Sequence, residues 1–340
     1  MQNNLSWSFE QVWNNSLLNT KPRAIRPRDH IWASEVGGSY VERYLKMKGT
    51  AYSNPPNARS LRKFEAGNIF EWIVEIVLRR AGVWQSKQDY IEVKIPGQLK
   101  VTGKLDHLAG GSPDWERSKA EIHQSDLPDF IKHSADSVIV DFSQKYPEGL
   151  KPLVLEVKSV ASTIFHRYET YRQADPKHAL QLFHYLTGLN MPEGHIIYIS
   201  KDDLSLAEIG VMNPSPIENV YRSDIKIMTD YFASPDLPPL EKPVEFNEMI
   251  GKFTANWKIA YSGYLTMLYG YKDQAEFDEK YKPMVARWNR VLARVVEGKN
   301  LTEDNNIAIS EMKEDFLNLD ELIEIAKTKK GKEEEDAVSN

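Results

Sequence analysis

The chain has 340 residues, of which 41% are hydrophobic and 27% charged, a composition typical of a soluble globular protein. It contains no cysteine, which excludes disulfides, thiolate chemistry and an iron–sulphur cluster held by cysteines. No stretch is apolar for long enough to cross a bilayer, and the first residues lack a cationic leader with an apolar core, so neither a membrane span nor a secretory signal is expected.

The formal net charge of −6 is unevenly distributed. Residues 1–110 carry 16 Lys and Arg against 10 Asp and Glu, whereas residues 201–340 carry 18 against 27. A set of basic residues in the first segment could form a phosphate-tracking surface. These residues are Lys21, Arg23, Arg26, Arg28, Arg59, Arg62 and Lys63. Clustering in sequence does not establish clustering in space, so unrelated solvated side chains explain the same pattern.

Two helices are predicted before the first strand. Residues 1–30 are expected to form an amphipathic helix, with Phe9, Val12, Trp13, Leu17 and Leu18 on its apolar side, and a basic linker. A longer helix is expected from about Arg59 to Ala81, because apolar residues recur there at three- and four-residue spacing. Glu71 lies inside this helix, one turn after Gly67.

Three strands are predicted next, at Val101–Leu108, Asp136–Phe142 and Leu153–Ser159. Asp106 lies near the end of the first strand, and a polar insertion is expected at about residues 110–135. A helix from Asp175 to Leu189 follows, with Asp175 as its N-cap, and Gln181 and Tyr185 lie on one face of it. Two further strands are expected at Gly194–Ser200 and Ala207–Met212.

A proline-bearing connector, Ser234–Pro239, marks an expected domain boundary. Residues 240–325 are predicted to form a helical extension rich in aromatic residues. Packing on the core is its default role, and the wall of a DNA channel or an oligomer interface are the alternatives. Residues 327–340 are rich in Lys, Gly and Glu and are predicted to be disordered.

One predicted strand carries a carboxylate and an ammonium two positions apart. Residues i and i+2 of a strand point to the same face, so Glu156 and Lys158 project together. Burying two charges is costly unless they are paired or bind a metal. A structural ion pair explains this motif by itself, but the acids on neighbouring elements, Glu71 and Asp106, favour a functional site.

In chain order these motifs resemble the PD-(D/E)xK nuclease superfamily, in the branch typified by the nuclease domain of RecB and by the CRISPR adaptation nucleases. The matching segments are Ser34-Glu35-Val36-Gly37 with Arg43-Tyr44-Leu45, Gly67-x-x-x-Glu71, Gly103-x-x-Asp106, Glu156-x-Lys158 and Gln181-x-x-x-Tyr185. Each is weak alone, but together they form a specific pattern over roughly residues 30–200. The resemblance implies a restriction-endonuclease-like core over residues 31–233, of fold class α/β (α+β), with a mixed central β-sheet flanked by helices.

The chain departs from the family pattern in several places. Leu105 precedes Asp106 where the name of the superfamily has a proline, and Glu71 stands where many members carry a histidine. The 49 residues between Asp106 and Glu156 exceed what a simple hairpin requires. The CRISPR adaptation nucleases also carry cysteines for an iron–sulphur cluster, and Ser39 falls near the position of their first cysteine.

Hydrolysis of a phosphodiester requires an activated water, neutralised charge on the phosphoryl oxygens and a stabilised leaving oxygen, and carboxylate-bound divalent metals provide all three. Carboxylate oxygens suit Mg²⁺ or Mn²⁺. Asp106 and Glu156 are the expected principal ligands, with Glu71 completing the shell. The resemblance implies that the backbone carbonyl of Val157 adds an oxygen. Lys158 would orient the water and offset developing charge.

Further residues are expected to bind DNA or to support the site, namely Gln181, Tyr185, Ser34, Arg43, Arg59 and Arg62. Structural alternatives stand beside these assignments. Asp106 could simply end a strand, Glu71 could be a solvated helix position, and Tyr185 could belong to the core. His178 and His184 are expected to be packing or solvated residues rather than ligands, and Glu35 is explained equally by a helix cap or a surface salt bridge.

The expected function is that of a metal-dependent DNA nuclease, a RecB-like exonuclease acting on DNA ends in recombination, repair or phage DNA processing. The alternatives are an endonuclease of a defence or restriction type and a catalytically silent nucleic-acid-binding module, and no residue distinguishes DNA from RNA as the substrate. The expected partners are DNA, a helicase or recombination protein and further copies of the chain. The resemblance implies the cytoplasm of a bacterium or of a phage-infected cell, with no membrane partner.

Overall fold

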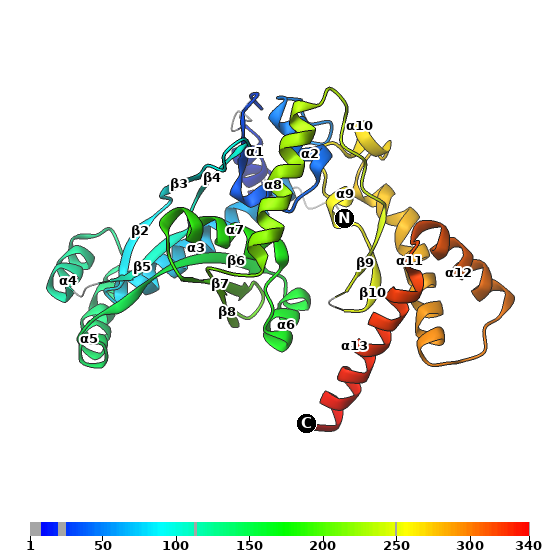
Figure 1. The fold of residues 1–340 in the computed structure, drawn as a ribbon. Coiled ribbons are helices and arrows are strands. Elements are labelled where there is room, and N and C mark those ends of the chain that lie inside the picture. The colour runs from blue at the N-terminus through cyan, green and yellow to red at the C-terminus, as the bar shows by residue number, and fades with distance from the viewer. Residues whose placement is uncertain (1–7, 20–24, 112–113, 249, 340) are drawn as a thin grey trace. The chain divides into compact units, whose positions relative to one another are not determined.

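The computed structural model describes residues 8–19, 25–111, 114–248 and 250–339 (Figure 1). The chain divides into two compact units. The first comprises Met1–Ala51 and Pro56–Pro238, and the second comprises Tyr52–Pro55 and Pro239–Asn340. The boundary after Pro238 falls within the predicted connector, whereas no sequence pattern indicated the short segment that joins the second unit.

The first unit is a mixed α/β structure with two sheets. Its strands are β1 (His30–Trp32), β2 (Trp84–Lys87), β3 (Tyr90–Val93), β4 (Lys100–Lys104), β5 (His107–Gly111), β6 (Leu150–Val160), β7 (Glu193–Ser200) and β8 (Leu206–Met212). One sheet has the order β2-β5-β6-β7-β8 and the other β1-β4-β3. Strands β6 and β7 pair in parallel, as do β1 and β4, while the other described pairs are antiparallel.

Helices flank these sheets. They are α1 (Phe9–Leu18), the 3₁₀ turn η1 (Ala33–Glu35), α2 (Tyr40–Met47), α3 (Ala58–Arg80), α4 (Trp115–Gln124), α5 (Asp129–Lys145), α6 (Ser162–Tyr171), α7 (Pro176–Leu189) and α8 (Ile217–Ala233). Parallel pairing of β6 and β7 requires a crossover, which α6 and α7 supply. The predicted fold class, a mixed sheet flanked by helices, is confirmed. None of the helices in the described ranges combines the length and the hydropathy that crossing a bilayer requires.

The predicted strand Asp136–Phe142 is wrong, because these residues lie in helix α5. The buried side chains of α5 are Ile131, Ala135 and Ile139, spaced four residues apart along one helix face. The β-branched run around Ile139 fits a strand over seven residues, and the helical period becomes visible only over the longer segment.

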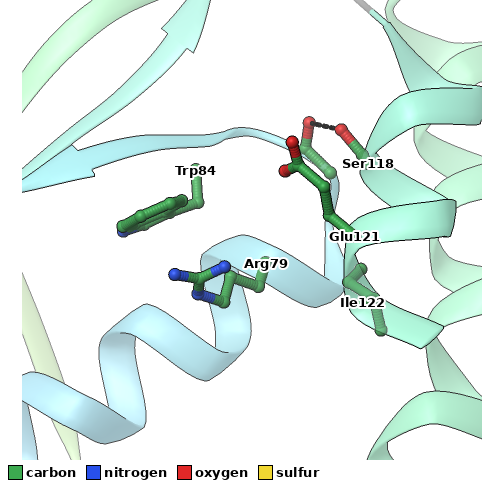
Figure 2. A pocket seen from close by; sticks show the side chains of 6 residues that line it. Arg79, Trp84, Ser118, Glu121 and Ile122 are labelled. Carbon is green, nitrogen blue, oxygen red and sulfur yellow. Dashed lines mark hydrogen bonds between the residues drawn. The ribbon is translucent and has the colours of Figure 1, made fainter. Parts of the chain in front are cut away.

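The predicted insertion is a helical hairpin, because α4 and α5 pack together through their apolar sides. Figure 2 shows where α4 meets the last turn of α3 and strand β2. The Ser118 hydroxyl donates a hydrogen bond of 3.1 Å to the carbonyl of Gly82, and the Arg79 guanidinium lies 3.6 Å from the ring centroid of Trp84. The Ser118 bond ties the insertion to the segment just before β2, and the Arg79–Trp84 contact packs α3 on β2.

The predicted strand Val101–Leu108 is in fact two strands in different sheets. Strand β4 ends at Lys104 in the three-stranded sheet, and β5 begins at His107 in the five-stranded sheet. Leu105, which is fully buried, and Asp106 form the crossing between them. The chain therefore turns at Asp106, a residue that the sequence pattern predicts to be a ligand.

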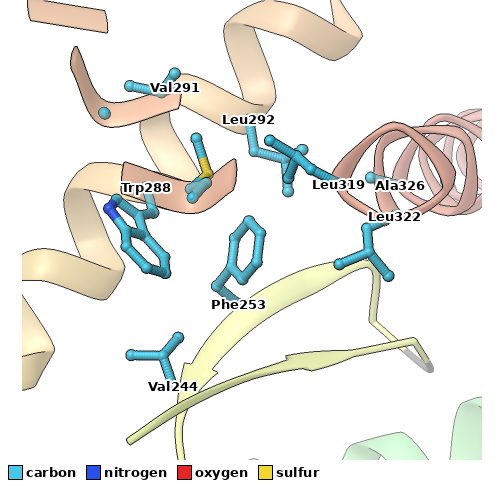
Figure 3. Packing of buried hydrophobic residues seen from close by; sticks show 10 residues of the cluster. Val244, Phe253, Trp288, Val291, Leu292, Leu319, Leu322 and Ala326 are labelled. Carbon is cyan, nitrogen blue, oxygen red and sulfur yellow. The ribbon is translucent and has the colours of Figure 1, made fainter. Parts of the chain in front are cut away.

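The second unit begins with a β-hairpin, so the prediction of an entirely helical extension is wrong at its start. The hairpin consists of β9 (Val244–Asn247) and β10 (Lys252–Ala255), and the helices are α9 (Trp257–Ala260), α10 (Leu265–Tyr269), α11 (Gln274–Val296), α12 (Glu303–Asp315) and α13 (Leu319–Ser339). Figure 3 shows Phe253 of the hairpin inside the core of this unit, with its ring centroid 5.4 Å from that of Trp288. Helix α13 continues through residues 327–339, where the sequence predicts disorder.

Helix α7 carries a buried histidine that links it to two other elements of the first unit. His184 is fully buried, with Nδ1 2.8 Å from the Tyr221 hydroxyl and Nε2 3.3 Å from the carbonyl oxygen of Ile91. Burial lowers the pKa of His184 to about 4. The imidazole is therefore neutral at pH 7, which agrees with the packing role expected from the sequence.

We expect His184 to make the fold sensitive to acid. Because folding lowers the pKa of His184 from 6.5 to about 4, the stability linked to the neutral ring is present above pH 6.5 and is lost as the pH falls toward 4. Between pH 7 and pH 5 this loss should be about 2 kcal/mol. In urea unfolding at the two pH values, His184→Gln should lose less stability on acidification than the wild type. Equal losses in the two proteins would contradict this explanation.

Candidate active site

Strand β6 places two charged side chains on one face of the five-stranded sheet. The ammonium of Lys158 is hydrogen-bonded to Oε1 of Glu156. The Glu156 side chain is fully buried and that of Lys158 is 22% exposed. The intervening residue Val157 is also buried, and the strand alternation directs its side chain to the other face. The central strand of the sheet thus carries a paired carboxylate and ammonium.

Asp106 reaches this strand from the crossing between the two sheets. Its Oδ2 accepts a hydrogen bond of 2.8 Å from the backbone N–H of Val157, and its side chain is buried. The neighbouring His107 pairs with Leu155 in the β5–β6 ladder. The carboxylate of Asp106 therefore lies beside the residue that separates Glu156 from Lys158.

Glu71 approaches the same place from helix α3. Its backbone carbonyl accepts a hydrogen bond of 3.1 Å from Nε2 of His107, which ties the helix to strand β5. The side chains of Glu71 and Asp106 line one cavity of about 290 Å³, together with Trp72 and Gln88. Three chain segments thus meet around this cavity, namely helix α3, the turn after β2 and the crossing at Asp106.

Burial raises the pKa of the three acids of this cluster, and neighbouring carboxylates add to the effect at Glu71 and Glu156. Burial raises the pKa of Glu156 to about 8 despite the opposing effect of Lys158. Burial, followed by the charge of Asp106, raises the pKa of Glu71 to about 7, and burial also raises the pKa of Asp106. Burial acts to lower the pKa of Lys158, but the three carboxylates outweigh it, so that this pKa is raised. Three carboxylates share one ammonium, and additional positive charge would stabilise their ionised forms.

The donor types of the cluster suit a hard divalent cation. Oε2 of Glu156 is buried without a hydrogen-bond partner, which is unfavourable unless a cation or a donor meets it. In the described part of the chain, no three acidic or histidine side chains are gathered closely enough to hold one ion as they stand. Asp106 is bonded to Val157 and Glu156 to Lys158, so an ion would have to join or displace these bonds.

Gln181 and Tyr185 act on the segment that carries Asp106. Gln181 Nε2 donates to the Tyr185 hydroxyl at 3.3 Å, and this hydroxyl donates to the carbonyl of Lys104 at 2.8 Å. Gly103 makes the approach possible, because a Cβ there would lie 2.8 Å from Cε1 of Tyr185 and 2.7 Å from Cβ of Ala33. Tyr185 is only 1% exposed, so in this structure it positions the site from within the core.

The residues of the first matching motif have different surroundings. Ser34 is exposed in turn η1, next to Ala33, which packs at Gly103. Glu35 forms an ion pair of 2.6 Å with Arg28 and also accepts a hydrogen bond from the backbone of Trp32. The local ion pair therefore accounts for Glu35 without a catalytic role.

Arg43 lies in the interior, at 2% exposure. Its guanidinium forms two hydrogen bonds to the Asp224 carboxylate, of 2.7 and 2.9 Å, and a third of 3.1 Å to the carbonyl of Gly38. The sequence predicts that Arg43 binds DNA or supports the site. Its burial is incompatible with contact to DNA, and support of the site stays a prediction. The partner of Arg43 is 181 residues away in sequence, and the pair joins α2 to α8.

The predicted basic surface is partly used by other contacts. Arg62 hydrogen-bonds to Asn14, and its guanidinium lies 5.6 Å from the ring centroid of Trp13, so it holds α1 to α3. Arg59, in the first turn of α3, is exposed. The remaining members behave differently: Arg28 is paired with Glu35, Arg26 and Lys63 are exposed, and Lys21 and Arg23 lie outside the described residues.

The cavity also contains residues that the motifs did not indicate. Trp72 follows Glu71 and His107 follows Asp106, so adjacency to a predicted ligand was the only sequence indication for them. Gln88 comes from the turn between β2 and β3, which carries no motif.

Comparisons with known proteins give no family assignment. No family model matches the chain, and no curated protein matches it. Among solved structures, SSO0001 is similar with a TM-score of 0.41 and 14% identity, covering 76% of this chain and 95% of that one. The alkaline exonuclease LHK-Exo from Laribacter hongkongensis is similar with a TM-score of 0.35 and 11% identity, covering 65% of this chain and 94% of that one. Its complex with dAMP gives 0.36 and 10%, covering 65% and 92%. Identities and TM-scores this low support no functional assignment, so a proposal about function has to rest on the geometry of the site.

The burial of Arg43 leads to a prediction about stability. Asp224→Ala should lower the free energy of unfolding by about 3–5 kcal/mol, because it leaves the buried guanidinium of Arg43 without its charge partner. Urea denaturation measures this loss. The matched control is Glu218→Ala, which removes another acid of α8, one that forms an exposed i,i+4 pair with Arg222 and should cost less than about 1 kcal/mol. Similar losses in the two variants would rule out a structural role for the Arg43–Asp224 pair.

Proposed function

We propose that the chain is a metal-dependent nuclease that hydrolyses phosphodiester bonds in DNA. The observation that carries this proposal is the meeting of Asp106, Glu156 and Lys158, through the hydrogen bond between Asp106 and the Val157 backbone. Asp106 also lines a cavity together with Glu71. The raised pKa values of Glu71 and Glu156 support it, since a bound cation would offset the repulsion between the acids.

Each residue of the cluster is proposed to have its own role in hydrolysis. Asp106 and Glu156 would hold the ion, with Glu71 and the carbonyl of Val157 completing its shell, and the ion would neutralise charge on the phosphoryl oxygens and favour deprotonation of the attacking water. Lys158, partly exposed beside Glu156, would orient that water and stabilise charge that develops on the phosphate.

The proposed supporting residues act one layer further out. Tyr185 fixes the position of the Lys104 carbonyl, two residues before Asp106, and Gln181 holds the Tyr185 hydroxyl. Ser34 and Arg59 are exposed on unit 1 and are proposed to contact the DNA backbone, whereas Arg43 and Arg62 support the fold through internal partners.

Within this activity we favour a RecB-like exonuclease that acts on DNA ends in recombination, repair or phage DNA processing, in keeping with the motif order of the PD-(D/E)xK superfamily. The intact set of Asp106, Glu156 and Lys158 supports an active enzyme rather than a silent binding module. The ions proposed are Mg²⁺ or Mn²⁺, because the donors are carboxylate oxygens.

The first prediction from this proposal concerns cleavage. With Mg²⁺ or Mn²⁺ the wild type should degrade linear DNA, and Asp106→Ala and Lys158→Ala should each slow it about 100-fold or more, because a preorganised charge at the reacting phosphate is removed. Gel analysis of linear and covalently closed circular DNA measures both activity and mode.

The matched control for Lys158→Ala is Lys151→Ala, which removes an exposed lysine of the same strand β6 and should retain full activity. Undiminished cleavage by both Asp106→Ala and Lys158→Ala would overturn the assignment. Ready cutting of closed circles would instead replace the exonuclease by an endonuclease at the same site.

The second prediction concerns the ion itself. Titration with Mn²⁺, monitored by isothermal calorimetry or electron paramagnetic resonance, should show one binding site in the wild type. Glu156→Gln should lower the affinity of this site about 10-fold or more, because the charge of one ligand is lost. Glu92→Gln, which changes an acid of β3 that pairs with Lys94, should bind Mn²⁺ like the wild type. Equal binding by wild type and Glu156→Gln would place the ion elsewhere.

A further inference from the structure

The cavity beside the acids has a second set of lining side chains that the proposed hydrolysis does not use. Helix α3 contributes Asn68 and Trp72, which are four residues apart and lie on one face, and the turn between β2 and β3 contributes Gln88. These are an aromatic ring and two amides, groups that recognise flat, hydrogen-bonding molecules rather than metal ions.

Trp72 is 48% exposed and lines the cavity next to Glu71. Helix α3 exposes other apolar side chains as well, among them Ile69 at 51% and Val77 at 55%, but these do not line the cavity. Exposure alone therefore does not distinguish Trp72. Its position at the mouth of an acid-lined cavity does, because a flat ligand that enters there can cover the indole.

Gln88 is held at the cavity in a backbone conformation that is unusual for its type. Its φ of +57° lies in the left-handed region, which is unfavourable for residues with a side chain. The N–H of Gln88 donates a hydrogen bond of 2.8 Å to the carbonyl of Leu105, directly before Asp106. This bond holds the backbone of Gln88 close to Asp106, the proposed metal ligand.

The polar groups around the cavity are incompletely paired. Asn68 and Gln88 are exposed, and their side-chain amides form no hydrogen bond within the described residues, so these amides face solvent and are open to a ligand. His107, which also lines the cavity and is 1% exposed, has its Nδ1 atom buried without a partner. Lys87, by contrast, is bonded to Glu75 at 2.6 Å. The wall therefore combines unused donors and acceptors with a cation that is already neutralised.

We propose that this cavity binds the unpaired nucleobase of the nucleotide adjoining the cleaved phosphodiester. The base stacks on Trp72, and Asn68 and Gln88 hydrogen-bond to its edge. A volume of about 290 Å³ is at the lower limit of ordinary ligand pockets, about 300–1,000 Å³, and suits one base rather than a base pair. The inference rests on the proposed nuclease function for the position of the phosphodiester.

The substrate class follows from this arrangement. A base that enters the cavity cannot remain paired in a duplex, so the enzyme acts on single strands or on the frayed end of a duplex. Every base offers a π-face to Trp72, and an amide both donates and accepts hydrogen bonds. Recognition by these groups therefore tolerates all four bases, as removal of successive nucleotides requires.

The test uses the full chain with Lys158→Ala to slow cleavage, and short single-stranded oligonucleotides that carry 2-aminopurine at each position in turn. Binding should quench the fluorescence of the probe at one position. Trp72→Ala in the same background should abolish this quenching and weaken binding about 10- to 100-fold, which corresponds to the loss of one stacked base. Trp72→Phe should retain most of both effects, and a fully paired probe should not be quenched.

The matched control is Ile69→Ala, which removes an equally exposed apolar side chain of α3 outside the cavity and should leave binding and quenching unchanged. The inference is wrong if Trp72→Ala binds and quenches like its parent, or if an abasic nucleotide at the quenched position binds as tightly as a natural one.

The two proposals fail in different ways. If Lys158→Ala abolishes cleavage while Trp72→Ala binds and quenches normally, the nuclease proposal is supported and the proposed base subsite is wrong. If the wild type quenches the probe through Trp72 but cleaves no DNA, the cavity binds a base and the nuclease proposal is wrong, together with the position of that base beside a cleaved phosphodiester.

Discussion

The hydrogen bond from the Val157 N–H to Oδ2 of Asp106 is the interaction on which the site depends. The pairing of β5 with β6 ends at His107–Leu155, two residues before Val157. The N–H of Val157 therefore has no partner on β5, and it donates to the carboxylate of Asp106 instead. A buried N–H without a partner would cost about 1–3 kcal/mol. The bond therefore fixes both the point where the chain crosses between the sheets and the distance of Asp106 from Glu156 and Lys158.

The charges that this bond gathers are hard to explain by stability alone. A buried ion pair such as Glu156–Lys158 gains little over well-packed apolar residues, because desolvation offsets the attraction. Adding Asp106 and Glu71 makes the cluster less favourable, since burial and mutual repulsion raise the pKa of the acids. Functional sites are where such destabilised groups are retained. The surrounding fold has to compensate, and the buried apolar contacts of α7 do so from outside the cavity.

Local periodicity made part of this structure predictable. The strand alternation alone places Glu156 beside Lys158, and the long helical pattern gives α3 within one residue of its observed ends. Over a short segment such as Asp136–Phe142 in α5, the sequence fits the period of a strand as well as that of a helix, so the prediction failed there. The hairpin of β9 and β10 was missed because a helical pattern follows it. The partner of Arg43 lies 181 residues away, so no local pattern could show that this arginine is internal. The cavity wall formed by Trp72 and Gln88 depends in the same way on tertiary contacts.

The internal contacts of several arginines affect how the protein would bind the backbone of a nucleic acid. The surplus of positive charge in residues 1–110 suggests a long phosphate track, but several of its arginines are committed to internal partners: Arg28 to Glu35, Arg43 to Asp224 and Arg62 to Asn14. A surface that neutralises few phosphates gains little from counterion release. A stacking ring at the cavity would add binding energy close to the reacting phosphate without any charge. In the proposed complex, exposed cations such as Arg59 would contact the backbone of the strand and Trp72 would stack on one base.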